Sequence, residues 1–180
     1  VVLPFAGSTY CARAVNTSAL AHPTGTSIVS DRPVAVTLHD DSAIGNLLGG
    51  TCQDLMGDQM VPDNILGTEY IPVRGYLNWS DHIEVCATQD NTTLTVDGVD
   101  LATLDEGESY EYIMEDEAAY LQSSLPVAVW QSTGFGCELG GALLPSVKCT
   151  GSYSVVFVRS TDEFFAMNLL VPAGGEGDFT

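Results

Sequence analysis

Short runs in which apolar and polar residues alternate recur along the chain about every ten residues. His82–Ala87 is the clearest run, because Ile83, Val85 and Ala87 fall at every second position, as in a half-buried strand. The stretch 90–99 predicts a hairpin, since Asp97-Gly98 can supply the positive φ angles that a tight reversal needs. This spacing of strands is typical of a β-sandwich or a barrel, so the sequence predicts an all-β fold.

A proline followed by Val-Ala-Val occurs twice, at Pro33 and at Pro126, 93 residues apart. Proline cannot donate to a sheet ladder but is tolerated at the first residue of a strand, so each copy predicts the start of a buried strand. The same landmarks follow each copy in the same order: a Gly-rich loop with a Cys, an apolar segment ending in Pro, and a Gly-led strand ending in Arg. We therefore expect two tandem sandwich-like repeats, with closing strands at 1–30, a first repeat at 31–124 and an incomplete second repeat at 125–180.

Residues 1–30 resemble the last strands of such a repeat, which the second copy lacks. They can complete the second sandwich within the chain, or they can complete that of a neighbouring subunit by strand addition. Closure within the chain is the favoured arrangement. Leu3, Phe5 and Tyr10 are the candidate assembly residues of this segment. The predicted core consists of the inward residues of the paired strands: Val34, Val36, Ile83, Val85, Val127, Val129, Val155 and Phe157.

The chain has 5 Lys and Arg residues against 24 Asp and Glu residues, which gives a formal net charge of −19. This charge would repel phosphate backbones and anionic lipid, so the sequence disfavours binding to nucleic acid or to a membrane surface. Cations or cationic partners suit it electrostatically, and a solvated acidic surface explains the same composition. No run reaches the roughly 18 apolar residues that a membrane span requires, so we expect no span.

Five cysteines without a Cys-x-x-Cys pair favour an extracellular or cell-surface setting over a zinc site. Cys137 and Cys149 flank an eleven-residue loop, and we expect a disulfide between them. Cys52 with Cys86 is the second predicted pair, which leaves Cys11 over. Three acceptor triplets for N-glycosylation fit the same setting, at Asn16, Asn78 and Asn91.

His39-Asp40-Asp41 is the most site-like cluster, because an imidazole beside carboxylates can bind a metal or move a proton. Adjacent residues on a strand point to opposite faces, however, and the second repeat has Ser-Thr-Gly at the matching place. The chain also lacks a Gly-x-Ser-x-Gly nucleophile elbow. We therefore expect no catalytic residues and no enzyme, and a hydrolase that uses His39 with Asp40 or Asp41 is kept as a rival hypothesis.

Asp90, Asp97 and Asp100 place carboxylates near turns, where Ca²⁺ finds oxygen ligands. None of them belongs to an Asp-x-Asp-x-Asp-Gly loop, and aspartate as a turn former explains the same residues. No cofactor is therefore expected, with calcium a weak candidate. A calcium-dependent or carbohydrate-dependent binding module is a second rival.

Several segments together resemble the IgGFc-binding protein N-terminal domain family. They are the Pro-Val-Ala-Val strands and the sequences at 57–62, 67–72, 83–98 and 104–110. The resemblance extends from Ser30 to Val158 and rests on turns and strand starts, not on a catalytic signature. It implies an extracellular β module of large adhesive or mucus-associated animal proteins and of bacterial surface proteins.

We therefore predict a non-enzymatic extracellular adhesion or structural module, as a subunit of a surface filament or as a segment of a large surface protein. Its expected partners are proteins, further copies of itself or glycans.

Overall fold

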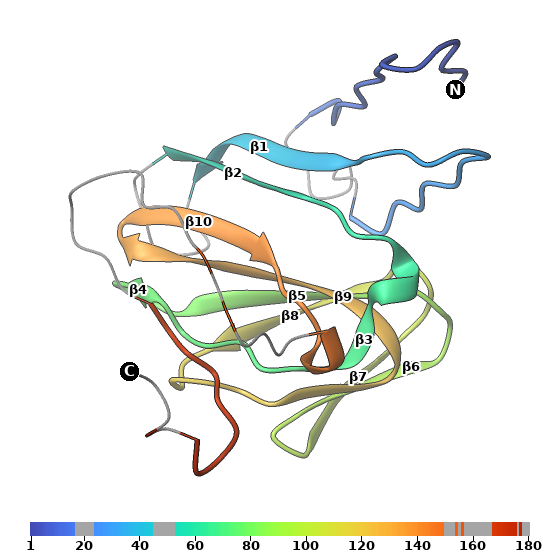
Figure 1. The fold of residues 1–180 in the computed structure, drawn as a ribbon. Coiled ribbons are helices and arrows are strands. Elements are labelled where there is room, and N and C mark those ends of the chain that lie inside the picture. The colour runs from blue at the N-terminus through green and yellow to red at the C-terminus, as the bar shows by residue number, and fades with distance from the viewer. Residues whose placement is uncertain are drawn as a thin grey trace.

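The structure is a computed structural model that describes residues 1–16, 24–44, 53–149, 154, 156, 167–175 and 177. Ten strands and two short 3₁₀ helices form its secondary structure within these residues (Figure 1). The strands are β1 (Thr37–Ile44), β2 (Gln53–Gln59), β3 (Gly67–Tyr70), β4 (Tyr76–Leu77), β5 (Asp81–Ala87), β6 (Thr92–Val96), β7 (Val99–Leu104), β8 (Ser109–Met114), β9 (Leu121–Gly136) and β10 (Glu138–Leu143). The 3₁₀ helices are η2 (Asp63–Ile65) and η3 (Val147–Cys149). The predicted all-β class is confirmed.

The 16-residue strand β9 organises the main sheet. Along one of its edges β9 pairs first with β6, through 121–123, and then with β5, through 127–132. Along the other edge it pairs with β3 and then with β10. Strands β7 and β8 continue one another in the next row, because β7 pairs with β6 and β8 pairs with β5. The eight-stranded sheet curls until it is nearly closed on itself.

The strands of this sheet are interrupted at the same level in three adjacent rows: β5 followed by β6, β7 followed by β8, and β9. The sheet bends along this line, which we call the crease. We define the crease as residues 88–91 between β5 and β6, residues 105–108 between β7 and β8, and residues 124–126 within β9. The Thr88 hydroxyl donates to the Pro126 carbonyl at 2.6 Å, which joins two of these rows. Proline is tolerated there because β9 changes its ladder partner at this point. Pro126 therefore lies inside a strand and not at its first residue, although the buried residues Val127 and Val129 follow it directly.

The first Pro-led run differs from the prediction. Residues 33–36 belong to no strand, and β1 begins at Thr37, where Gln59 of β2 becomes its partner. Val34 is 49% exposed, so its predicted core position is wrong, and Val36 is half-buried. Ile83, Val85, Val127 and Val129 are fully buried as predicted, whereas Val155 and Phe157 lie outside the described residues.

The hairpin between β6 and β7 is confirmed. Val96 pairs with Val99, so Asp97 and Gly98 form a two-residue loop with φ angles of 51° and 79°. Both angles are positive, as the turn that matches the twist of a two-residue hairpin requires.

Strand β2 covers the outer edge of β10. Its half-buried residues Asp54, Met56 and Asp58 alternate with exposed ones. The Leu139 amide donates to Asp54 Oδ2 at 2.7 Å, and the Leu143 amide donates to Asp58 Oδ2 at 3.0 Å. Two side-chain carboxylates thus take the place of backbone carbonyls, so these two amides of the edge strand are satisfied.

The predicted domain boundary between residues 124 and 125 falls within β9, so described residues on both of its sides share one sheet. The described part of 1–30 contains no strand. Gly25 nevertheless lies against the crease, because a Cβ atom there would come within 2.1 Å of the Gly107 carbonyl oxygen. The division into repeat units at residues 30 and 124 remains a prediction.

Candidate protein-binding surface

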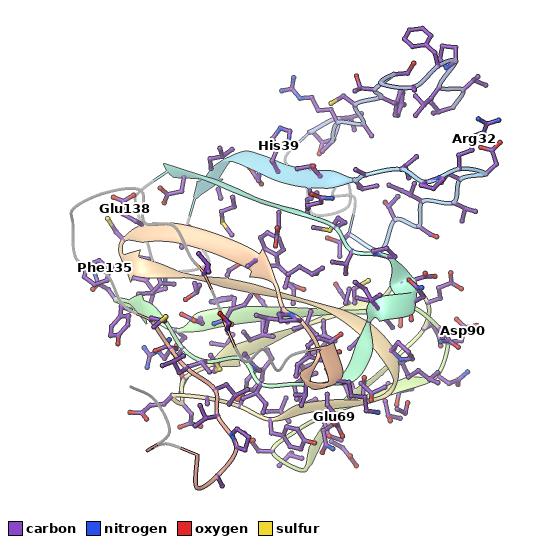
Figure 2. The ribbon with its side chains drawn as sticks, in the orientation of Figure 1. Arg32, His39, Glu69, Asp90, Phe135 and Glu138 are labelled. Carbon is purple, nitrogen blue, oxygen red and sulfur yellow. The ribbon has the colours of Figure 1, made fainter. Side chains whose placement is uncertain are left out.

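Two exposed aromatic side chains lie together at one end of the sheet. Tyr76 of β4 and Phe135 of β9 are direct partners in a short parallel ladder. They are 52% and 55% exposed, and their ring centroids are 6.3 Å apart with an interplanar angle of 46°. We call this pair the aromatic ledge. Phe135 lies at the edge of the molecule beside Glu138, its partner across the β9–β10 hairpin (Figure 2).

Glycine at position 75 brings the two strands of the ledge together. A Cβ atom at Gly75 would come within 2.1 Å of Thr133 Oγ1, so only glycine permits this close approach of β4 to β9. The amide of Asn78 donates to the Gly136 carbonyl at 3.0 Å and fixes the far end of β4.

A buried polar network holds the base of the ledge. Asp81 is fully buried, and its Oδ2 accepts from the Gly75 amide at 2.9 Å and from Gln131 Nε2 at 2.7 Å. Gln131 Nε2 also donates to the Val73 carbonyl at 2.8 Å. Since buried polar groups without partners are unfavourable, these bonds fix Val73 and Gly75 relative to β9.

A cavity of about 320 Å³ opens beside the ledge. Its lining residues come from β4 and the segment before it, from β9, from β10 and the residue after it, and from the C-terminal segment: Val73, Gly75, Tyr76, Gln131, Thr133, Gly134, Ala142, Leu144 and Asn168. The ledge thus combines exposed aromatic area, a rigid base and a neighbouring hollow, the features that protein-binding hot spots share.

One carboxylate borders the ledge directly. Glu138 is exposed and lies opposite Phe135 in the β9–β10 hairpin. Arg74 comes two residues before Tyr76 in the chain, and its guanidinium donates to the carbonyl groups of Glu115 and Trp79. A cationic side chain of a partner that packs on Phe135 would therefore meet Glu138.

The predicted His39 cluster lies on β1, which forms a separate two-stranded sheet with β2. His39 and Asp40 are exposed in β1, while the side chain of Asp41 lies outside the described part (Figure 2). His39 faces Gly57 across the ladder. No group of three or more His, Cys, Asp or Glu side chains within the described ranges could hold a metal ion.

A side-chain hydrogen bond at His82 was not predicted from the sequence. Its Nδ1 lies 2.6 Å from Glu111 Oε1 across β5 and β8. Glu84 lies directly opposite Glu111 in the same ladder, and the pKa of Glu84 is raised above its usual value by burial and then by the Glu111 charge. The signal was available only after the register of the two strands was known.

Two of the three calcium candidates accept backbone hydrogen bonds at turns. Asp90 Oδ1 accepts from the Glu106 amide at 3.0 Å, and Asp97 Oδ1 accepts from the Tyr120 amide at 2.9 Å. Asp100 is exposed on β7. Aspartate as a turn former therefore accounts for Asp90 and Asp97, and calcium binding stays an untested prediction.

Cys86 is a free thiol, which contradicts the predicted pair with Cys52. Cys86 is half-buried on β5, which lies between β8 and β9, and burial raises the pKa of its thiol. Cys137 is disulfide-bonded, but the side chains of Cys52 and Cys149 lie outside the described part, so the Cys137–Cys149 pair remains a prediction. Cys11 is free and exposed.

The remaining candidates are all on the surface. Asn16, Asn78 and Asn91 are exposed, as glycosylation acceptors must be. Leu3, Phe5 and Tyr10 are 43%, 73% and 65% exposed. Nothing in the structure tests glycosylation at the three asparagines or assembly through the three apolar residues.

The described residues form an all-β domain with an exposed aromatic pair at one end of its main sheet. The chain is a member of the IgGFc-binding family: the family described as IgGFc binding protein matches residues 12–174. This match confirms the resemblance drawn from the sequence and makes the chain a domain of an extracellular, protein-binding family. No curated protein and no solved structure matches the chain. Among the described residues, no helix has the length and apolar character needed to cross a membrane.

Proposed function

We propose that the chain is a non-enzymatic adhesion module of an extracellular protein and that it binds its protein partner through the aromatic ledge. The observation that carries the proposal is the exposed pair of Tyr76 and Phe135 on a fixed base. Tyrosine and phenylalanine are enriched in interface cores, because they supply a large contact area with few side-chain torsions to freeze.

The family description directs the choice of the first partner to the Fc region of immunoglobulin G. Glu138 would face a cationic side chain of the partner and would speed association at low salt. The exposed aromatic rings would supply most of the binding free energy, because full desolvation makes such residues hot spots.

The test is a binding titration with purified Fc fragment of immunoglobulin G, by surface plasmon resonance. We expect saturable binding and a Kd at least about tenfold higher for the double variant Tyr76→Ala with Phe135→Ala, equivalent to roughly 1.4 kcal/mol. Val99→Ala is the matched control, since Val99 is 62% exposed on β7, in the β6–β7 hairpin. Absence of Fc binding by the unmodified chain, or an unchanged Kd in the double variant, would overturn the proposal.

A further inference from the structure

The outer edge of β8 is unprotected. Strand β8 pairs with β5 only, and β7, which continues the same row, pairs with β6 only. Within the described ranges no strand pairs with the other side of β8 (Figure 1). We call this side of Ser109–Met114 the open edge. The outer edge of β10 differs, because the side chains of Asp54 and Asp58 accept hydrogen bonds from two of its amides.

Natural sheets blunt a free edge with charged side chains, above all lysine, or with proline, a bulge or a covering segment. The sequence Ser-Tyr-Glu-Tyr-Ile-Met of β8 contains neither lysine nor proline, and its pairing with β5 runs without a bulge. Its one charged side chain, Glu111, lies 2.6 Å from Nδ1 of His82 on the paired strand β5. Tyr110 and Tyr112 are only partly buried where they pack against the core, and Ile113 is 51% exposed. The open edge is therefore an apolar strand that lacks a partner among the described residues.

Carboxylates surround the open edge. Glu111 lies within β8, and Glu115 and Asp116 follow its last residue. The pKa of Tyr112 is raised by burial and then by the charges of Asp97, Asp116 and Glu115, so acidic groups from both ends of the β7–β8 row converge near this ring. A strand that adds here should carry positive charge and no carboxylate.

The N-terminal segment 1–16, which we call the arm, has that composition. It contains Arg13 and no Asp or Glu, whereas residues 37–180 contain 23 Asp and Glu residues and 3 Lys and Arg residues. Residues 8–14 belong to no helix or strand. In Figure 1 the arm, in dark blue, projects away from the sheet. Its large apolar side chains are exposed: Val1 88%, Val2 86%, Leu3 43%, Phe5 73%, Tyr10 65% and Val15 89%.

We propose that the arm of one copy of this chain adds as a strand to the open edge of a second copy. Backbone hydrogen bonds to β8 would supply the affinity, Tyr10 would cover the partly exposed tyrosines, and Arg13 would meet the surrounding carboxylates. Each copy carries one arm and one open edge, so the contact is head-to-tail and repeats into an open chain unless it closes into a ring. This surface is separate from the aromatic ledge, so the inference stands independently of the proposed function.

The test is sedimentation velocity over protein concentrations up to about 0.5 mM, a range that reaches weak interfaces. All proteins carry Cys11→Ser, so that an intermolecular disulfide cannot mimic the contact. The arm variant is Ala12→Pro, which removes an amide and resists pairing. The edge variant is Ile113→Asp, at a half-exposed position that should leave the fold intact by circular dichroism. Leu55→Asp, at an exposed position on β2, is the matched control.

We expect the parent protein and Leu55→Asp to grow with concentration beyond a dimer. The arm variant and the edge variant should each remain at the 19.1 kDa monomer, because each has lost one half of the contact. Mixed in equal amounts, they should form dimers and nothing larger, since only one productive contact can form. A parent protein that stays monomeric, which is also the result of closure within the chain, would overturn the proposal. Variants that assemble like the parent would do so as well.

Discussion

At the scale of single residues, a buried aspartate, Asp81, lies at the base of the aromatic ledge. Asp81 is fully buried, and the two hydrogen bonds to its Oδ2 join the segment before β4 to the middle of β9. A buried network of this kind fixes one arrangement of the strands, because any other arrangement leaves a charge or a donor without a partner. The sequence offered no sign of it, since Asp81 and Gln131 are 50 residues apart.

Asp81→Ala should destabilise the protein by about 3 kcal/mol, because it leaves the Gly75 amide and Gln131 Nε2 without their acceptor. Urea denaturation at neutral pH measures the loss. Asp81→Asn retains an acceptor oxygen and should lose less. Asp63→Ala, at an exposed position of η2, is the control and should change stability by less than about 0.5 kcal/mol. Equal effects of Asp81→Ala and Asp63→Ala would show that the network contributes nothing.

Glu84 should make stability depend on pH. Burial and the charge of Glu111 raise its folded pKa, so ionisation of Glu84 weakens the folded state as pH rises through that value. Glu84→Gln should therefore raise the urea midpoint at pH 7, and the gain should vanish near pH 3, where the carboxyl is protonated in both states. Glu117→Gln, in an exposed turn, is the matched control and should show no such change between the two pH values. A gain of the same size at pH 3 would contradict this explanation.

At the scale of elements, alternation predicted strands whose inward residues are apolar. It missed β2, whose inward residues are acidic, and β10, whose Gly-rich sequence was expected to be part of a loop between Cys137 and Cys149. Residues 82–87 and the Asp97-Gly98 hairpin follow the predicted pattern. Strand β2 was not predicted, because Asp54 and Asp58 are its half-buried residues and read as polar loop. The position of Pro126 inside β9 was also not predicted. It depends on the crease, where three segments far apart in the sequence lie side by side.

The double variant Asp54→Ala with Asp58→Ala should expose the edge of β10. The amides of Leu139 and Leu143 lose their acceptors, so their hydrogen exchange should accelerate by about tenfold or more. Exchange measured by NMR resolves the two amides. The Leu144 amide, which donates to the Val129 carbonyl at 2.8 Å, is the internal control and should keep its rate. Unchanged protection at Leu139 and Leu143 would show that β2 does not cap this edge.

At the scale of the whole molecule, the family resemblance predicted the class of partner but not its location on the surface. The net charge of −19 disfavoured nucleic acid and membranes without selecting a partner, and the family match supports a protein partner. The aromatic ledge was not found from the sequence, because Tyr76 and Phe135 meet only through a parallel ladder between residues 59 positions apart. Aromatic residues at such positions are usually core, and only the structure shows these two to be exposed.

Calcium should not stabilise the molecule, because the side chains of Asp90 and Asp97 already accept backbone hydrogen bonds. The melting temperature in excess Ca²⁺ and in excess chelator should agree within about 1 °C, since a ligand stabilises only what it binds. Differential scanning calorimetry gives both values. A clearly higher melting temperature with Ca²⁺ would favour the calcium-dependent rival.

Hydrogen exchange by mass spectrometry, with and without the Fc fragment of immunoglobulin G, tests the central claim most directly. If the aromatic ledge is the binding surface, peptides that cover residues 73–77 and 133–139 should exchange about fivefold more slowly in the complex. The β6–β7 hairpin at the other end of the sheet should be unaffected. No protection anywhere, or protection confined to regions other than the ledge, would contradict the account.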